Sequence, residues 1–333
     1  MRRTRVCDLL DITVPILQGG MLWIATAELA AAVSNAGALG VISPLAGMAK
    51  QGEPAKNFKA QLAKIKPLTP KPFGVNILLE LDYADALVEV ALSEKVKVVV
   101  TAAGSPARFT GILKNEGVTV LHVVSSVKHA QKAESCGVDG VIAEGIEAGA
   151  HNGADELPLF ALIPQVVDEI SIPLIAAGGI ADARGVVAAF SLGAEGVQLG
   201  TRFVAVHENA AHLNYKQAIV DAKDTDTVIT TRSIVPTRSL KTEFTNTIIE
   251  LERSGAAPED IMEFIGWRSN RTAQIDGNLE GGEAYCGAAA GLIKEILPAK
   301  DVIRQLAEIF LFFGLSSKKE NYNLPLRSQL SLR

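Results

Sequence analysis

The chain has few cysteines and no long apolar run. Its three cysteines, Cys7, Cys136 and Cys286, lie far apart and form no Cys-x-x-Cys pair. The spacing therefore predicts neither a disulfide framework nor a zinc site, and we expect no metal. No segment approaches the roughly 18 apolar residues of a membrane span, and Asp8 and Asp11 interrupt the region where a signal peptide would need an apolar core. We expect a cytoplasmic protein that does not bind membranes.

The chain also lacks an excess of positive charge. It has 32 Lys and Arg residues against 37 Asp and Glu residues, which gives a formal net charge of −5. Binding to a nucleic-acid backbone needs a basic surface, so nucleic acid is not expected as a partner. We expect a small-molecule substrate, and the sequence leaves a homodimer open.

Short apolar runs alternate with segments of helical periodicity. Eight runs are candidate strands: Val14–Gln18, Leu39–Ser43, Phe73–Leu78, Val96–Thr101, Thr119–Val124, Gly140–Ala143, Pro173–Ala177 and Gly196–Leu199. Nearly continuous apolar strands separated by helices are typical of parallel sheets that are covered on both faces. Eight such units close a TIM (β/α)8 barrel, an α/β fold, which we favour. A doubly wound sheet is the alternative, weakened because no Gly-x-Gly-x-x-Gly follows the first strand.

The pattern changes after the eighth candidate strand. From about Ala205 to Glu283 the chain is more polar and mostly helical, with no strand of the earlier kind. Small residues return at Tyr285, and the amphipathic stretch Lys294–Phe310 is typical of a last barrel helix. The predicted organisation is a barrel (1–204), an inserted helical lid subdomain (205–284), the last barrel helix (285–312) and a disordered tail (313–333).

Glycine-rich turns follow the seventh and eighth candidate strands. The loops after these two strands commonly hold phosphate in barrel enzymes. Backbone N–H groups at Gly178, Gly179, Gly200 and Thr201 would be free to cradle a phosphate there. The alternative is two tight turns at the barrel rim.

The sixth candidate strand leads into a second glycine-rich loop, Glu144–Gly153. His151 is the side chain in this loop that titrates near neutral pH without help, so it is the candidate for moving a proton. Glu147 is close enough in sequence to orient it, or is a surface carboxylate. Asn76 on the third strand is either a satisfied core amide or a hydrogen-bonding partner for a heteroaromatic ring. The loop itself has a plain alternative, a solvated turn.

Five segments together carry a family resemblance. They are Pro15–Met21 (PILQGGM), Lys71–Ile77 (KPFGVNI), Glu144–Gly153 (EGIEAGAHNG), Ile175–Asp182 (IAAGGIAD) and Gly196–Phe203 (GVQLGTRF). In order and spacing the chain resembles the nitronate monooxygenase (2-nitropropane dioxygenase) superfamily. That superfamily includes the FMN-dependent enoyl-acyl-carrier-protein reductase II.

The resemblance implies an FMN-binding barrel in which His151 matches the catalytic histidine of the family. The residues that it assigns to the cofactor site are Gly20, Met21, Asn76, Glu144, Gly149, Gly178, Gly179, Gln198, Leu199, Gly200 and Thr201. In the monooxygenases this histidine is thought to act as a base on the carbon beside the nitro group. In the reductases its counterpart assists reduction of an enoyl thioester with electrons from NAD(P)H.

The subfamily markers disagree. Glu144 is typical of the reductases, whereas many monooxygenases have Gln at this position. Ala150 and Asn152 depart from the reductase motif, and a polar Asn152 suits a small polar substrate better than a long acyl chain. Our first expectation is an FMN-dependent oxidation of alkyl nitronates with O2, because the monooxygenases are the broader class. The alternatives are an NAD(P)H-dependent enoyl-acyl-carrier-protein or quinone reductase and, without redox chemistry, a phosphate-binding isomerase or lyase.

Overall fold

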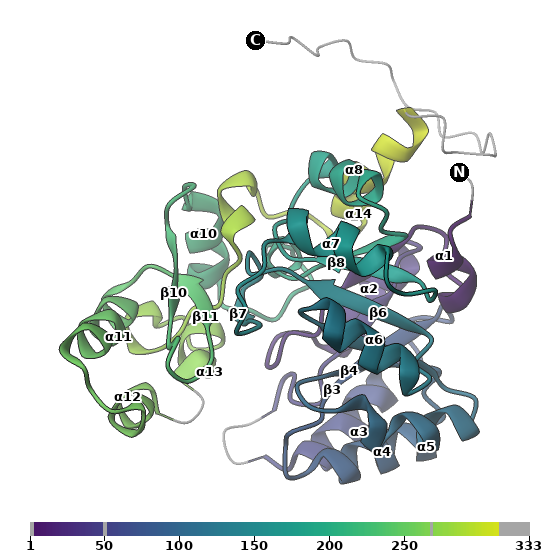
Figure 1. The fold of residues 1–333 in the computed structure, drawn as a ribbon, viewed down its shortest axis with the longest axis horizontal. Coiled ribbons are helices and arrows are strands. Elements are labelled where there is room, and N and C mark those ends of the chain that lie inside the picture. Colours follow the sequence, from purple (N-terminus) through teal and green to yellow (C-terminus); the bar gives the residue numbers. More distant parts are fainter. Residues whose placement is uncertain (1–2, 49–51, 267–268, 313–333) are drawn as a thin grey trace.

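The computed structural model describes residues 3–48, 52–266 and 269–312 and places eight parallel strands in one barrel-like sheet (Figure 1). The strand order is β1-β9-β8-β6-β5-β4-β3-β2, with only parallel pairing. The strands are β1 Ile16–Gln18, β2 Gly40–Ile42, β3 Phe73–Leu78, β4 Val98–Ala102, β5 Thr119–Val124, β6 Gly140–Glu144, β8 Leu174–Ala177 and β9 Gly196–Leu199. Each one overlaps a predicted run, so the predicted TIM barrel is confirmed.

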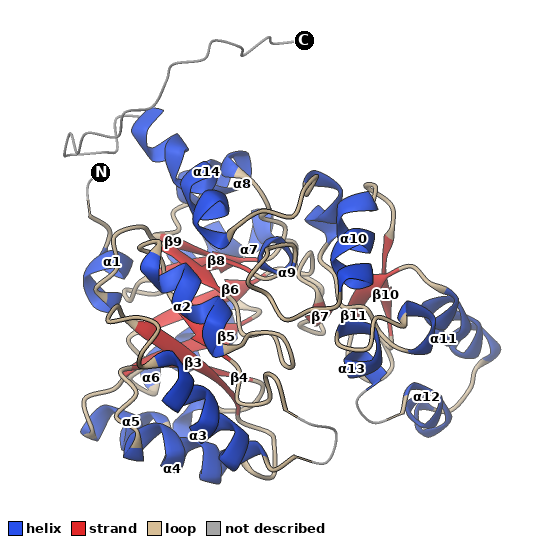
Figure 2. Cartoon of the chain, turned by 180° about the vertical axis from the view of Figure 1, so that it is seen from behind, coloured by secondary structure: helices blue, strands red, loops and turns tan. Residues whose placement is uncertain are grey.

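Helices cover the outside of the sheet (Figure 2). They are α2 Ala27–Asn35, α3 Pro54–Ile65, α4 Ala84–Ser93, α5 Thr110–Asn115, α6 Val127–Ser135, α7 Leu159–Val167, α8 Ala183–Ser191 and α14 Ala299–Phe312, with the short 3-10 turn η1 Pro106–Arg108 before α5. The sequence pattern did not predict α3, whose buried apolar side chains are only Phe58, Leu62 and Ile65. The helix α14 begins at Ala299 rather than at Lys294.

Alternate strand residues fill the barrel interior. Leu17, Leu39, Val100 and Leu121 belong to one buried cluster that also contains residues of α1 (Arg5–Leu10). The other strand face packs against the surrounding helices in a second, larger cluster. Because both faces are covered, the strands read as continuous apolar runs in the sequence.

The barrel closes between β1 and β2 with the help of one side chain. Few backbone bonds join these strands: Gln18 N–H donates to Leu39 O at 3.0 Å and Leu39 N–H donates to Ile16 O at 2.9 Å. The buried Gln18 amide adds two more, since its Nε2 donates to Val41 O and its Oε1 accepts from Val41 N–H, both at 3.1 Å. The Gln18 side-chain amide thus makes the two hydrogen bonds to Val41 that the backbone of a neighbouring strand would make in a regular sheet.

The segment between β9 and α14 forms a separate lobe beside the barrel (Figures 1 and 2). Its elements are α9 Thr201–Val204, α10 Leu213–Asp221, β10 Thr227–Thr230, β11 Thr237–Leu240, α11 Glu243–Ser254, α12 Pro258–Ile265, α13 Ser269–Gln274 and the 3-10 turns η2 Leu279–Gly281 and η3 Ala288–Leu292. The sequence predicted a mostly helical segment with no strand of the apolar kind, and the structure adds two half-polar antiparallel strands, β10 and β11. The hairpin β10–β11 pairs with β7 (Ala150–His151), so the lobe shares a small sheet with the His151 loop.

Two further expectations concern the ends and the membrane. The predicted disordered tail, 313–333, lies outside the described residues. Within the part of the chain that the structure describes, no helix is long and apolar enough to cross a membrane.

Replacing Gln18 by Leu should destabilise the barrel. The substitution leaves Val41 N–H and C=O buried without the amide partner, which costs about 2 kcal/mol or more in the free energy of unfolding. Urea unfolding of Gln18→Leu and of Gln165→Leu, an exposed position on α7, measures this. Equal losses for both variants would show that the Gln18 amide does not support closure.

Candidate active site

The glycine loops after β8 and β9 line a narrow cavity of about 150 Å³. Gly178 and Gly179 have φ angles of +93° and +69°, a backbone region that favours glycine. Gly200 has an ordinary φ of −100°, and a Cβ added there would meet nothing within 4 Å. The wall at Gly200 is therefore bare backbone with open space beside it, whereas Gly178 and Gly179 pack against Ala148 and Glu147.

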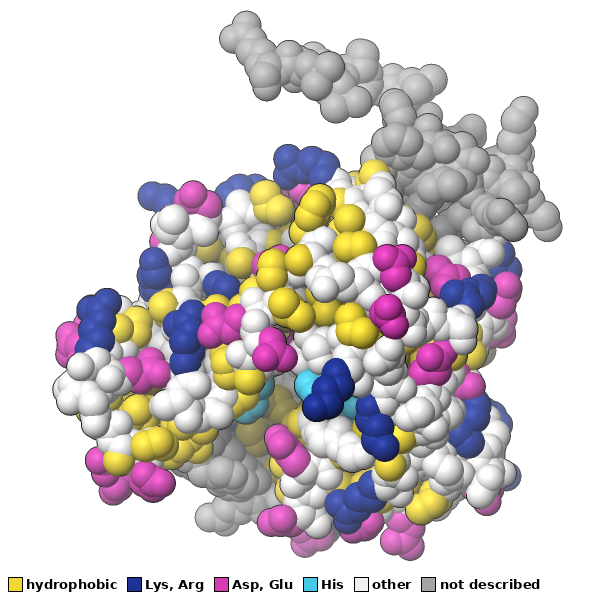
Figure 3. Space-filling model, in the orientation of Figure 1, with side chains coloured by type: hydrophobic (Ala, Val, Ile, Leu, Met, Phe, Trp, Pro, Cys, Tyr) yellow, Lys and Arg dark blue, Asp and Glu magenta, His cyan; other side chains and the backbone are white. Residues whose placement is uncertain are grey.

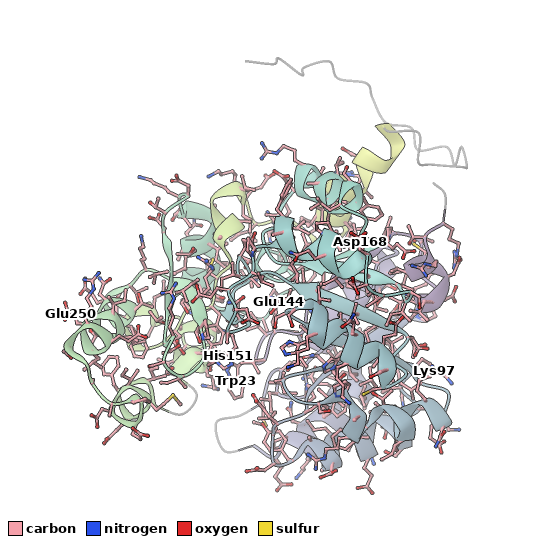
Figure 4. The ribbon with its side chains drawn as sticks, viewed as in Figure 1. Trp23, Lys97, Glu144, His151, Asp168 and Glu250 are labelled. Carbon is pink, nitrogen blue, oxygen red and sulfur yellow. The ribbon has the colours of Figure 1, made fainter. Side chains whose placement is uncertain are left out.

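A wider cavity of about 890 Å³ adjoins the narrow one. Both are lined by Gly20, Glu144, Gly149, Gln198 and Tyr285, so they meet along these residues. The wide part is walled by apolar side chains: Trp23, Leu45, Leu78, Leu81, Val100, Val124 and Val235. Figure 4 shows Trp23, Glu144 and His151 in the region between the barrel and the lobe.

All twelve predicted site residues line one or both cavities. The narrow cavity alone receives Met21, Gly178, Gly179, Leu199, Gly200 and Thr201. The wide cavity alone receives Asn76 and His151, and both receive Gly20, Glu144, Gly149 and Gln198. Gly20 approaches Asn76 so closely that a Cβ on Gly20 would clash with it. The structure thus brings the predicted residues together, while their chemical roles remain predictions.

His151 stands at the cavity wall on β7, where it pairs with Thr237 of β11. Its ring meets the Tyr285 ring edge to face, with 5.9 Å between centroids and 62° between planes. The ring is reachable from the cavity, yet the surrounding protein desolvates it and lowers the pKa of the imidazole, an effect that the charge of Glu80 partly opposes. His151 is therefore mostly neutral at pH 7.

The two residues beside His151 shape its loop. Ala150 has a φ of +70°, a left-handed conformation that costs a non-glycine residue about 1 kcal/mol or more. Asn152 is buried, and its Nδ2 donates to Ala148 O at 3.1 Å and to Ala150 O at 2.8 Å. The amide nitrogen of Asn152 thus holds the loop, whereas its Oδ1 accepts no hydrogen bond within the described chain, and the residue lines the wide cavity.

Glu147 does not orient His151. Both of its carboxylate oxygens accept from Leu159 N–H, at 3.0 and 2.9 Å, so it caps the first turn of α7. This is neither of the roles that the sequence suggested. The carboxylate ties the catalytic-loop region to the helix that follows.

Glu144 ends β6 at the junction of the two cavities. Desolvation by burial raises the pKa of its carboxyl to about 7. In the described part of the chain its carboxylate has no ion pair or hydrogen bond. A carboxyl in this state carries its proton about half of the time at neutral pH, so it can either donate or accept.

Three buried amides at the cavities have an oxygen without a partner. Gln198 Oε1 and Gln274 Oε1 accept no hydrogen bond within the described chain, and both residues line the narrow cavity. Asn152 Oδ1 is likewise unpaired there, and Asn152 lines the wide cavity. Leaving a buried acceptor unpaired costs about 1–3 kcal/mol. A ligand that carries N–H or O–H groups would offset this cost.

Part of the site comes from residues that the sequence reasoning did not select. Tyr215, Gln274, Tyr285 and Gly287 line the narrow cavity from the lobe side. Gly287 N–H donates to Thr201 Oγ1 at 2.9 Å, which joins this segment to the end of β9. The small residues from Tyr285 onward were the one signal in the sequence that a close approach occurs here.

His122 is a second histidine at the wide cavity, on β5 of the barrel. It is buried, and its Nδ1 lies 2.7 Å from Thr101 Oγ1. Burial lowers the pKa of the His122 imidazole to about 4. It also lines the wide cavity as a neutral polar group, which the sequence did not predict.

Comparison with known proteins decides the family. A profile described as Nitronate monooxygenase matches residues 3–87 and 79–308. The chain belongs to the nitronate monooxygenase family. It is therefore an enzyme of an oxidoreductase superfamily, and the isomerase or lyase alternative is not retained.

Relatives within the nitronate monooxygenase family have different names. The structure of FabK from Thermotoga maritima is 44% identical, covers 95% of this chain and 98% of its own, and has a TM-score of 0.88. A Mycobacterium tuberculosis protein, (3aS,4S,5R,7aS)-5-hydroxy-7a-methyl-1-oxo-octahydro-1H-indene-4-carboxyl-CoA dehydrogenase, is 31% identical over 91% of this chain and 95% of the relative. A probable nitronate monooxygenase of Staphylococcus saprophyticus is 37% identical over 75% of this chain and 81% of the relative.

Glu144→Gln should change how stability depends on pH. The folded-state pKa of about 7 lies above the ordinary 4.5, so the folded protein holds this proton more tightly than the unfolded chain does. Burying the Glu144 carboxyl therefore leaves the free energy of unfolding unchanged below pH 4.5 and lowers it progressively as the pH rises toward 7. Above pH 7 the loss is constant. Relative to wild type, the melting temperature of Glu144→Gln should increase across this interval.

The exposed Glu250→Gln variant changes the net charge equally and is the control. If the difference in melting temperature between Glu144→Gln and wild type does not change between pH 4.5 and 7, the pKa of Glu144 is not raised in the folded protein.

Proposed function

We propose that the chain is an FMN-dependent reductase of enoyl thioesters that takes electrons from NAD(P)H. The observation that carries the proposal is the wide, apolar-walled cavity of about 890 Å³ beside His151. An alkyl nitronate would fill little of this volume, whereas an acyl chain would use the apolar wall. The proposal departs from our first expectation, because the volume and the apolar wall of this cavity exceed what a small nitronate needs.

Two relatives support a thioester substrate. FabK of Thermotoga maritima, at 44% identity over nearly the whole chain, is an enoyl-acyl-carrier-protein reductase II. The relative from Mycobacterium tuberculosis is named as a dehydrogenase of a carboxyl-CoA compound. Glu144, which is typical of the reductases, points the same way.

The residues at the narrow cavity and at its junction with the wide cavity fit FMN. The open space at Gly200 leaves room for the phosphate in the narrow cavity, with Thr201, Gly178 and Gly179 beside it. The unpaired oxygens of Gln198 and Gln274 are acceptors suited to the N–H and O–H groups of a flavin and its ribityl chain. The other residues proposed to contact it are Gly20, Met21, Asn76, Glu144, Gly149 and Leu199. Bound FMN would supply the electron pair for reduction.

His151 moves the proton in this proposal. Reduction of an enoyl thioester adds a proton at the carbon next to the thioester carbonyl. Desolvation lowers the pKa of the His151 imidazole, so its protonated form gives up the proton more readily. The Tyr285 ring limits where the imidazole can turn.

Nitronate oxidation is the second candidate. It is favoured by the neutral state of His151, which suits a base that removes a proton from carbon. The 37% identical relative from Staphylococcus saprophyticus carries the corresponding name.

The two candidates separate in paired assays of the FMN-loaded protein. Anaerobic NADH or NADPH oxidation is followed with crotonyl-CoA, and oxygen uptake is followed with propionate 3-nitronate. Thioester-dependent oxidation of NAD(P)H supports the proposal. Rapid oxygen uptake with the nitronate, without thioester reduction, would replace it by the second candidate.

Gly200→Leu should weaken flavin binding and leave the fold intact. The added side chain starts in open space at the narrow cavity, so it displaces ligand rather than protein. We expect the dissociation constant for FMN to rise on the order of 100-fold, because about two charge-assisted hydrogen bonds to the phosphate are lost. Flavin fluorescence titration measures it.

The control is Gly111→Leu on α5, where an added Cβ likewise meets nothing within 4 Å. If Gly200→Leu binds FMN as tightly as wild type, these loops do not bind the FMN phosphate.

His151→Ala should keep FMN and lose turnover. Loss of a general acid or base lowers kcat by about 10² to 10⁴. Steady-state kinetics beside a flavin titration separate the two effects, and the exposed His207→Ala is the matched control. A variant with wild-type kcat would exclude His151 from the proton transfer.

A further inference from the structure

A small cationic patch lies where the wide cavity opens. Ser125, His129 and Lys132 all line this cavity, and we call them the rim patch. His129 and Lys132 are three residues apart on α6, so they share one face of the helix, and both are exposed. Ser125 Oγ lies 3.1 Å from His129 Nδ1. Figure 3 shows His beside Lys or Arg side chains at the edge of a hollow with apolar side chains within it.

The ammonium group of the rim patch is unpaired within the described chain: Lys132 forms no ion pair, whereas Lys59, Lys66 and Lys114 do. Besides Glu144, the acidic residue that lines the cavity is Glu80, which follows β3, two strands away from β5 in the sheet. An anionic group entering the cavity is therefore attracted to the β5–α6 side and repelled from the β3 side.

The cavity thus suits a ligand with two unlike parts. Its wall is apolar, His151 lines it from β7, and the rim patch adds a hydroxyl, an imidazole and an ammonium group from α6 and the turn just before it. Ammonium and hydroxyl donors are suited to a phosphate. A thioester carried on a pantetheine arm has this arrangement, because the phosphate lies at the opposite end of the arm from the thioester.

We infer that the rim patch binds the phosphate of a pantetheine arm while the thioester reacts beside His151, with Lys132 as the principal contact. The inference rests on the proposed thioester function. Coenzyme A and acyl carrier proteins both present this phosphate, and the site recognises the group that they share.

The test compares Lys132→Ala with Lys128→Ala, an exposed lysine on the same helix that does not line the cavity. The substrates are crotonyl thioesters of pantetheine, coenzyme A and an acyl carrier protein. Lys132→Ala should raise KM for the coenzyme A and carrier-protein thioesters about tenfold, because one charge-assisted hydrogen bond to the phosphate is lost. It should leave kcat and the KM for crotonyl-pantetheine, which has no phosphate, unchanged.

Calorimetric binding of free coenzyme A to the FMN-loaded protein gives a readout that does not need turnover. Lys132→Ala should weaken this binding about tenfold, and Lys132→Arg should restore most of it. Unchanged binding in Lys132→Ala overturns the inference even if thioesters are reduced. A KM increase confined to the carrier-protein thioester also overturns it, because Lys132 would then contact the carrier's surface and not the phosphate.

The failures are distinguishable. If wild type binds coenzyme A through Lys132 but reduces no thioester, the proposed reductase activity fails and the phosphate site stands.

Discussion

The site depends on one backbone contact between the barrel and the lobe. Gly149 and Gly287 approach so closely that a Cβ on Gly149 would lie 2.8 Å from Gly287 N. Ala288 N–H donates to Glu147 O at 2.8 Å, and Gly287 N–H donates to Thr201 Oγ1. This contact brings the lobe over the ends of β6 and β9, and it places Tyr285 against the catalytic loop. The barrel alone would leave the loop open to solvent.

The two joined cavities carry different costs. The narrow cavity keeps unpaired amide oxygens at Gln198 and Gln274, and Glu144 at the junction holds a carboxyl with no described partner. Ala150 adds backbone strain beside His151. Such features lower stability and gather where function requires them. The wide cavity is mostly apolar, so the proposed thioester would bind there through the burial of apolar surface and react beside His151.

The sequence predicted the barrel because its strands are buried on both faces and therefore appear as apolar runs; Phe73–Leu78 is recovered residue for residue. It did not predict β10, a short strand (TVIT) whose residues are half polar, or α3, which has few apolar residues. The glycine loops could be placed from motifs that follow strands. Tyr285 could not, because its position beside His151 depends on how the chain returns after the whole lobe.

The most direct test of the account is whether a thioester ligand in the wide cavity is sensed by a flavin at the junction of the two cavities. Butyryl-CoA, which is saturated and cannot be reduced further, is titrated into the FMN-loaded protein while the visible absorption of the flavin is recorded. The account predicts a saturable change in the flavin spectrum, since the two cavities share Glu144, Gly149 and Gln198. Calorimetric binding of butyryl-CoA with no change in the flavin spectrum would contradict it.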